Sequence, residues 1–379
     1  MVTNQAPYGS TLTHAAAAPA GSVAAPAVRL LTVDAESAGQ RLDNFLLRHL
    51  KGVPKTHVYR IIRSGEVRLN KGRAQADTRI EVGDVVRLPP VRVSDKVDVK
   101  AAAMAAPTPA NQALRAAAQA MRVLFEDDAV LAVAKPAGVA VHGGSGVSFG
   151  VIEQLRMARP EAKFLELVHR LDRETSGILL IAKKRSALKA LQDQFRERET
   201  GKTYLALAAG LWPANKKVLD KPLYKFEDEA VGGERRVKVV SRDDPNGMKA
   251  VTLVKVRHRS AEPAQAGAHF KVTGPFSLLE VTIKTGRTHQ IRVHLAAEGM
   301  PIAGDDKYGV FELNKALEKA GPVPLKRMFL HAWALQFTHP VSGQRVHLHC
   351  LLPSELLQFA QQVLPTLKDD ALEPAHPTI

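Results

Sequence analysis

Residues 178–182 form an uninterrupted apolar run, Ile-Leu-Leu-Ile-Ala, and this run restricts the fold more than any other feature of the chain. Such a run is typical of a strand that is buried on both faces. A second apolar segment, 164–168, lies before it, and polar residues 169–177 connect the two. Thr175, Ser176 and Gly177 are turn-forming residues at the end of this connection. We therefore expect two buried strands joined by a tight polar connection.

That connection holds a carboxylate, Asp172, between Arg170 and Arg173. A carboxylate mounted rigidly among cations is typical of a reactive group. To act as a nucleophile or base it must be ionised in a partly dry pocket, and because burial disfavours charge it needs a close cation. Arg292 lies early in an expected helix over 290–295, where the fold can bring it to Asp172. The same residues also suit a simple turn that Asp172 closes, with both neighbouring arginines solvated.

The size and charge of the chain restrict its partners. A length of 379 residues indicates two folded units plus tails, and a formal net charge of +15 favours a polyanionic partner. Cys350 is the single cysteine, which excludes an internal disulfide and suits a reducing compartment. No apolar run approaches the ~20 residues of a membrane span. The first thirty residues lack the basic start of a secretory signal, so we expect a cytoplasmic protein without membrane contact.

Changes in composition predict the domain boundaries. The N-terminal residues are rich in Ala, Pro, Gly, Ser and Thr, and a second alanine-rich stretch interrupts the chain near residue 100. Residues 215–267 are polar without a clear period, which predicts surface strands and loops. The expected segments are a disordered tail (1–37), a small folded unit (38–97), a flexible linker (98–120), a larger folded unit (121–365) and a C-terminal tail (366–379).

The small unit carries a dense positive charge. Between residues 41 and 73 there are nine Lys or Arg against two Asp or Glu, a net charge of +7. A solvated helix face normally mixes its signs, so phosphate binding is the better interpretation. The expected second helix, whose apolar face is Val58, Ile61 and Ile62, carries three of these cations: Lys55, Arg60 and Arg63.

The small unit resembles an S4 RNA-binding domain, the helix-helix-strand module of ribosomal protein S4 and several RNA-modifying enzymes. The resemblance covers about residues 40–88. The segments that carry it are Arg-Leu-Asp-Asn-Phe at 41–45, Ile-Ile-Arg-Ser-Gly-Glu-Val-Arg-Leu-Asn at 61–70 and Val-Gly-Asp at 82–84.

The larger unit resembles the RluA family of pseudouridine synthases. Four motifs in the family's order span about residues 123–309, too many for chance agreement. They are Lys135-Pro136-x-Gly138, the connection at 169–177, Lys202-x-Tyr204-Leu205-Ala206, and Gly-Arg-Thr-His-Gln-Ile-Arg-Val-His at 286–294. The fold that this resemblance implies is α+β, with a mixed, largely antiparallel sheet and a central basic cleft.

The resemblance also implies roles for single residues. Asp172 corresponds to the catalytic aspartate, Tyr204 to the tyrosine that stacks on the target base, and Arg292 to the arginine that pairs with the aspartate. Arg170 corresponds to the residue that fills the space of the flipped nucleotide. Lys135 and Arg287, which lie in the same motifs, are expected to contact the substrate together with Lys55, Arg60 and Arg63.

The implied reaction needs no cofactor or metal: the C1′–N1 bond of a uridine breaks, the uracil turns, and a C1′–C5 bond forms. Attack by Asp172 on the sugar and removal of a sugar proton are both compatible with the sequence. The S4-type segments are most similar to members of the family that modify 23S rRNA of the large ribosomal subunit, and we expect a monomer. Two alternatives are a synthase for another 23S site or tRNA, and a catalytically inert RNA-binding assembly factor.

Overall fold

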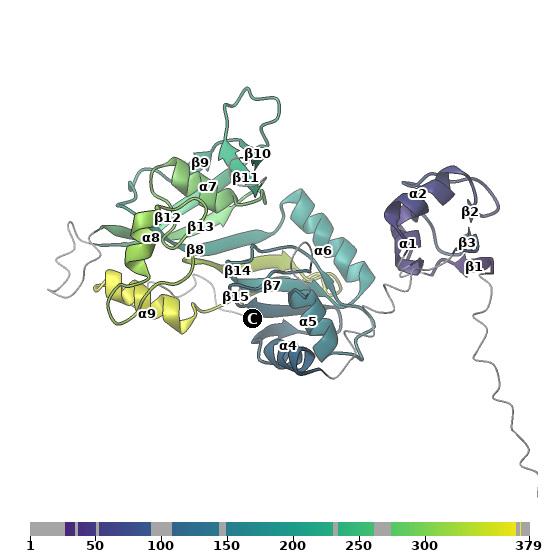
Figure 1. Ribbon diagram of the computed structural model, residues 1–379, viewed down its shortest axis with the longest axis horizontal. Helices are drawn as coiled ribbons and strands as arrows, with labels where there is room; N and C mark the ends of the chain where they lie inside the picture. The colour runs from purple at the N-terminus through teal and green to yellow at the C-terminus, as the bar shows by residue number, and fades with distance from the viewer. Residues whose placement is uncertain are drawn as a thin grey trace, which may run out of the picture. The chain divides into compact units, whose positions relative to one another are not determined.

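The computed structural model describes residues 27–34, 37–50, 53–91, 108–143, 149–229, 234–260, 274–368 and 372. The chain divides into two units, Met1–Ala101 and Ala102–Ile379. Their elements are labelled in Figure 1. We describe each unit by itself.

The first unit packs two short helices against a small antiparallel sheet in the order β1-β3-β2. The helical spacing expected from the sequence is confirmed, since Phe45, Val58 and Ile61 are buried between the helices and the sheet. One expectation is wrong: residues 29–32 belong to β1, paired with β3, and not to a disordered tail. The elements are β1 (Arg29–Thr32), α1 (Leu42–His49), α2 (Lys55–Arg63), β2 (Arg68–Leu69) and β3 (Val85–Leu88).

The second unit is built on a ten-stranded sheet in the order β4-β5-β7-β14-β8-β13-β12-β9, with β15 paired to β14 and β6 to β7. The pair β7–β14 is parallel and the other pairs are antiparallel, so the expected mixed, largely antiparallel sheet is confirmed. Its strands are β4 (Val123–Glu126), β5 (Val130–Lys135), β6 (Glu166–Leu167), β7 (Ser176–Ala182), β8 (Gly201–Ala209), β9 (Val218–Asp220), β12 (Val251–Arg259), β13 (Phe276–Ile283), β14 (Leu330–Thr338) and β15 (Arg345–His349).

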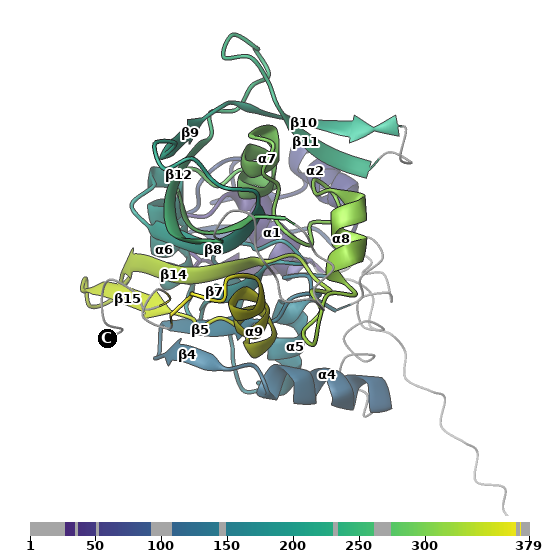
Figure 2. The same ribbon diagram turned by 90° about the vertical axis from the view of Figure 1, so that its left-hand side faces the viewer.

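Strand β7 explains the apolar run, because its two faces contact different layers. Leu179 and Ile181 pack with helices α4 (Pro109–Gln119) and α5 (Val151–Ala158). Leu180 and Ala182 point the other way and pack with α6 (Arg185–Glu197). Figure 2 shows α4 and α5 beside β4 and β5. A strand covered on both faces has no exposed position for a polar residue.

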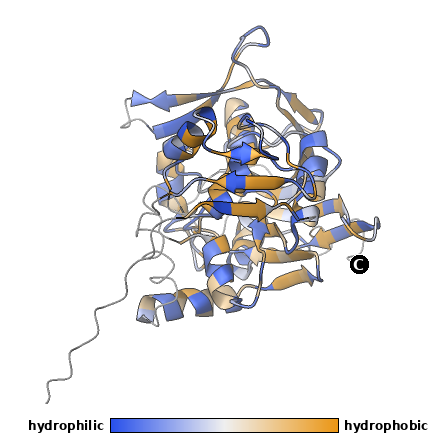
Figure 3. Ribbon diagram, turned by 90° about the vertical axis from the view of Figure 1, so that its right-hand side faces the viewer, coloured by the Kyte–Doolittle hydropathy of each residue, from blue (hydrophilic) through white to orange (hydrophobic). Residues whose placement is uncertain are grey.

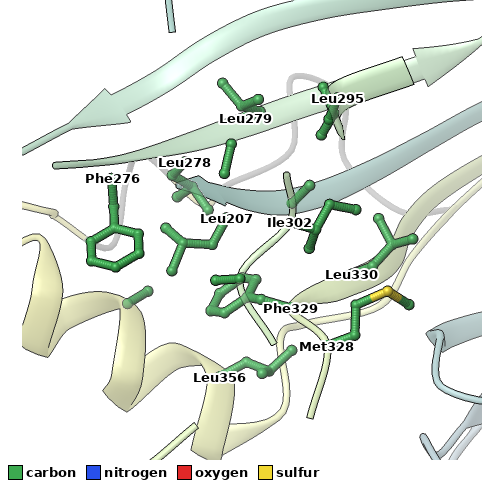
Figure 4. Close-up of a cluster of buried hydrophobic side chains, with 14 of the residues drawn as sticks. Leu207, Phe276, Leu278, Leu279, Leu295, Ile302, Met328, Phe329, Leu330 and Leu356 are labelled. Carbon is green, nitrogen blue, oxygen red and sulfur yellow. The ribbon is translucent and has the colours of Figure 1, made fainter. Parts of the chain in front are cut away.

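The largest core lies on the other half of the sheet. Side chains from β8, β13 and β14 meet there, and Figure 4 shows Leu207, Phe276 and Leu330 among them. The helices that cover this core are α7 (Gln290–Ala297), α8 (Phe311–Leu317) and α9 (Ser354–Val363). In Figure 3 the hydrophobic colour lies mainly along the strands, whereas the helices show both colours, as amphipathic covering helices should.

The structure corrects one expectation in this unit, the flexible linker, and adds detail to the expected surface strands. Residues 109–119 of the expected linker form α4, which packs on α5 through an apolar face; residues 92–107 lie outside the described residues. The polar segment 215–267 contains β9, β12 and a separate hairpin of β10 (Leu223–Asp228) and β11 (Glu234–Val239). Within the described ranges, no helix has the length and apolar character needed to cross a membrane.

Candidate active site

The polar connection before β7 opens into a cavity of about 120 Å³. This volume is below the 300–1,000 Å³ of sites for drug-sized ligands. Side chains from the β6–β7 connection, β8 and the start of α7 line it, including Arg170, Asp172, Tyr204, Arg287 and Arg292. Three of the four sequence motifs therefore meet at one cavity.

Asp172 is held at the mouth of this cavity by its own backbone. The Thr175 amide donates to the Asp172 carbonyl at 3.2 Å, which closes the turn, and Gly138 donates to the carbonyl of Arg173 at 2.9 Å. The Asp172 side chain is 22 % exposed. Two groups face its Oδ2 atom: Arg292 Nη1 at 3.7 Å and His289 Nε2 at 3.9 Å. Asp172 thus does more than close a turn, because a buried cation lies beside its carboxylate.

Arg292 is oriented by a carboxylate that the sequence reasoning missed. Asp305 accepts hydrogen bonds from Arg292 Nε at 2.8 Å and Nη2 at 2.7 Å, a fork-to-fork arrangement with no exposed surface on the Asp305 side chain. Asp306 Oδ1 lies 3.3 Å from Nη2. This clamp fixes the guanidinium plane and leaves Nη1 directed at Asp172. Burial raises the pKa of Asp305, but the Arg292 hydrogen bonds and charge outweigh it and hold that pKa below its usual value.

Tyr204 supplies an aromatic ring from β8. The ring packs against two of the core clusters of the sheet and also lines the cavity. Burial raises the pKa of Tyr204, and the Asp172 carboxylate raises it further. The side chain is therefore a neutral phenol at physiological pH, with an apolar face available to a planar group.

A buried amide explains why the motif at 286–294 contains Gln290. Its Oε1 accepts from Thr285 Oγ1 at 2.7 Å and from the Arg287 amide at 3.1 Å, and its Nε2 donates to the Val251 carbonyl at 3.0 Å and to Thr252 Oγ1 at 2.9 Å. These four bonds hold the loop before α7. The loop leads into α7 through its N-cap, His289, whose φ of 52° is left-handed.

The expected substrate contact of Lys135 is wrong. Its side chain is buried, with 1 % of its surface exposed. Its Nζ donates to the carbonyls of Pro136 at 2.8 Å, Val139 at 2.7 Å and Arg173 at 3.0 Å. Burial lowers the pKa of Lys135 to about 7, and the carboxylates of Glu174 and Asp172 oppose that shift. Because a buried ammonium needs acceptors, Lys135 ties β5 to the loop that carries Asp172 and does not face the cavity.

The other predicted cations remain accessible. Arg170 is exposed at the cavity and Arg287 is half-buried there. On the first unit, Lys55, Arg60 and Arg63 are all exposed along α2, as a phosphate-binding face requires. Arg41 differs from these three cations, because its Nη2 atom is paired with Asp43 Oδ2 at 2.7 Å.

In the described part of the chain, no three His, Cys, Asp or Glu side chains are grouped so that they could hold a metal ion. His347 and His349 both lie on β15, and the Trp333 ring contacts that of His349 edge-on.

Comparison with known proteins identifies the families that the two units match. Residues 129–297 match the family of RNA pseudouridylate synthases, and residues 40–86 match the S4 domain. The protein named ribosomal large subunit pseudouridine synthase C of Yersinia pestis is 48 % identical over 331 residues, 87 % of this chain and 94 % of that protein. The protein of the same name in Escherichia coli strain K12 is 46 % identical over 338 residues, which cover 89 % of this chain and 97 % of that protein.

A solved structure supports the fold. Human RNA pseudouridylate synthase domain containing 1 superposes with a TM-score of 0.50 at 24 % identity, over 63 % of this chain and 87 % of that one. The fold, the motifs around Asp172 and the match to full-length relatives agree: the chain belongs to the RNA pseudouridine synthase family, as a member with an S4 domain.

Proposed function

We propose that this enzyme converts specific uridines of 23S rRNA in the large ribosomal subunit to pseudouridine. The observation that carries the proposal is the position of Asp172, 3.7 Å from the clamped Arg292 in a cavity that Tyr204 also lines. The names of the relatives, which cover most of this chain, support the large-subunit substrate.

The geometry suits a reaction on a base taken out of an RNA helix. A flipped uracil needs a ring to stack on, and Tyr204 presents one in the cavity as a neutral phenol. Arg170, exposed at the cavity, fills the space that the base leaves. Arg292 lies 3.7 Å from the Asp172 carboxylate, which either attacks C1′ of the sugar or removes a sugar proton. The C1′–N1 bond breaks, the uracil turns, and C5 bonds to C1′. C5 then loses its proton and N1 takes one up, so the atoms balance without a cofactor.

The S4 unit supplies affinity and site choice in this proposal. The first unit binds RNA phosphates, chiefly through Lys55, Arg60 and Arg63 on α2, and the second unit carries the chemistry. Since the S4 unit holds none of the residues around Asp172, it is not needed for the chemical step itself. The enzyme acts as a monomer in the cytoplasm, where ribosomal RNA is processed.

Pseudouridine mapping tests the substrate. Ribosomal RNA and tRNA are sequenced from cells that lack the gene, and from the same cells complemented with the wild type or with Asp172→Asn. We expect particular 23S pseudouridines to disappear and to return with the wild type alone. Loss confined to tRNA contradicts the 23S assignment. Full complementation by Asp172→Asn contradicts the role of the carboxylate.

A further inference from the structure

His289 has an unusual backbone conformation directly beside Asp172. It is the N-cap of α7, with φ 52° and ψ 22°, a left-handed geometry that residues with a side chain rarely adopt. Its ring is part of the cavity wall, with Nε2 3.9 Å from Asp172 Oδ2. Strained backbone persists where the surrounding structure enforces it, and it concentrates at functional sites.

A chain of hydrogen bonds orients this ring. The Val237 amide on β11 donates to Tyr308 Oη at 3.0 Å, and Tyr308 Oη lies 2.8 Å from His289 Nδ1. If Tyr308 donates to Nδ1, the ring proton sits on Nε2 and faces the carboxylate. The opposite tautomer would turn a nitrogen lone pair toward the negative charge of Asp172, so the first arrangement is favoured.

The surroundings favour the neutral form of the ring. Burial lowers the pKa of His289; the carboxylates of Asp172 and Asp305 oppose this shift, and the cations of Arg292 and Lys307 add to it. Tyr308 is held in turn by its neighbours, because Arg292 lies over its ring at 5.1 Å and the rings of His289 and Tyr308 meet edge-on. His289 therefore presents a polarised N–H group to Asp172, while Arg292 supplies the charge.

We propose that His289 and Tyr308 are positioning residues for Asp172: Tyr308 fixes the imidazole so that its Nε2–H aims the carboxylate at the ribose of the bound uridine. The separation of 3.9 Å is longer than a hydrogen bond, and catalytic hydrogen bonds commonly tighten only when the substrate is bound. The proposal rests on the proposed function, because it assigns Asp172 the chemical step. It also links the β10–β11 hairpin, through the Val237 amide, to the carboxylate.

Single-turnover rates and RNA affinities of four full-length variants test the proposal. Tyr308→Phe keeps the ring and removes the hydroxyl, whereas His289→Asn removes the imidazole but tolerates the left-handed backbone. Each should lower the rate roughly ten- to hundredfold, the effect of losing one hydrogen bond to a charged group, with RNA affinity unchanged. The double variant should be no slower than His289→Asn alone, because both residues act in one chain. Tyr224→Phe, which changes a tyrosine on β10, is the matched control and should keep the wild-type rate.

The pH profile separates this role from a merely structural one. Without the Tyr308 hydroxyl, Nδ1 is free to bind a proton, so Tyr308→Phe should show a new titration of the rate that the wild type lacks. It should lie below the ordinary histidine pKa of about 6.5, because burial and the neighbouring cations still lower the pKa of His289. The double variant should lack this titration. Wild-type rates in both single variants, together with an inert Asp172→Asn enzyme, would overturn the inference and leave the proposed function intact. An active Asp172→Asn enzyme would overturn both.

Discussion

The Arg292–Asp305 pair leads to a sharp stability prediction. Asp305→Asn keeps the shape of the side chain and removes its charge, which leaves the Arg292 guanidinium buried with 6 % of its side chain exposed. Removing one partner of a buried ion pair costs about 3–5 kcal/mol, because the other charge stays desolvated. Domains are stable by only about 5–15 kcal/mol, so we expect the melting temperature of the catalytic unit to fall by roughly 10 °C.

The stability that Asp305→Asn loses should depend on pH in a defined direction. The pKa of Asp305 is lower in the folded protein than its usual value of 3.8. A carboxyl group of this kind contributes stability above its unfolded pKa, and this contribution is lost as pH falls through the folded pKa. The difference in unfolding free energy between wild type and Asp305→Asn should therefore be constant near neutral pH and shrink below about pH 4.

Urea unfolding followed by fluorescence and circular dichroism measures this difference. Asp193→Asn is the matched control, because Asp193 pairs with Arg196 at 2.8 Å on the surface, with side chains 35 % and 68 % exposed. An exposed pair contributes about 0–1 kcal/mol. If Asp305→Asn costs no more than Asp193→Asn, the clamp does not stabilise the site and the reasoning is wrong. Activity should fall as well, since the freed guanidinium is no longer aimed at Asp172.

Three further predictions test other parts of the structure. Tyr204→Leu should lower the single-turnover rate roughly ten- to hundredfold, because stacking on a base is worth about 1–3 kcal/mol. A rate within twofold of the wild type would exclude stacking. Gly177→Ala should abolish soluble expression, because the added Cβ would lie 2.2 Å from the Ala332 carbonyl oxygen and the backbone φ is +111°. Gly274→Ala is the control: a Cβ there meets open space, so this variant should express normally. Replacing Lys55, Arg60 and Arg63 by Ala should flatten the dependence of log affinity on log salt by about two to three units, and Arg196→Ala should not change it.

Local sequence patterns predicted the parts of this protein that depend on neighbours in the chain. The apolar run 178–182 became the fully covered strand β7, and the helical spacing of Val58, Ile61 and Ile62 became the buried face of α2. The resemblance to the RluA family identified the motifs that contribute Asp172, Tyr204 and Arg292 to one cavity. These features follow from periodicity and from motifs that keep their order.

Features set by distant contacts were missed. The partner that orients Arg292 is Asp305, in an irregular loop whose sequence carries no periodic signal, although two adjacent carboxylates at 305–306 were a visible hint. Lys135 was expected at the substrate because its charge is visible in the sequence, whereas its three carbonyl acceptors are not. The strands of the β10–β11 hairpin were obscured because most of their side chains are polar and only Leu223 and Val237 are buried.

The most direct test of the central claim is tritium release from 23S rRNA that carries [5-³H]uridine. Forming the C1′–C5 bond expels the hydrogen at C5, so release to water counts the chemical step. The wild type should release tritium stoichiometrically at its target sites. Asp172→Asn should bind the same RNA with nearly unchanged affinity and release less than about a hundredth as fast, because a nucleophile or base contributes several powers of ten. Release by Asp172→Asn above that level would contradict the assignment of the chemistry to this carboxylate.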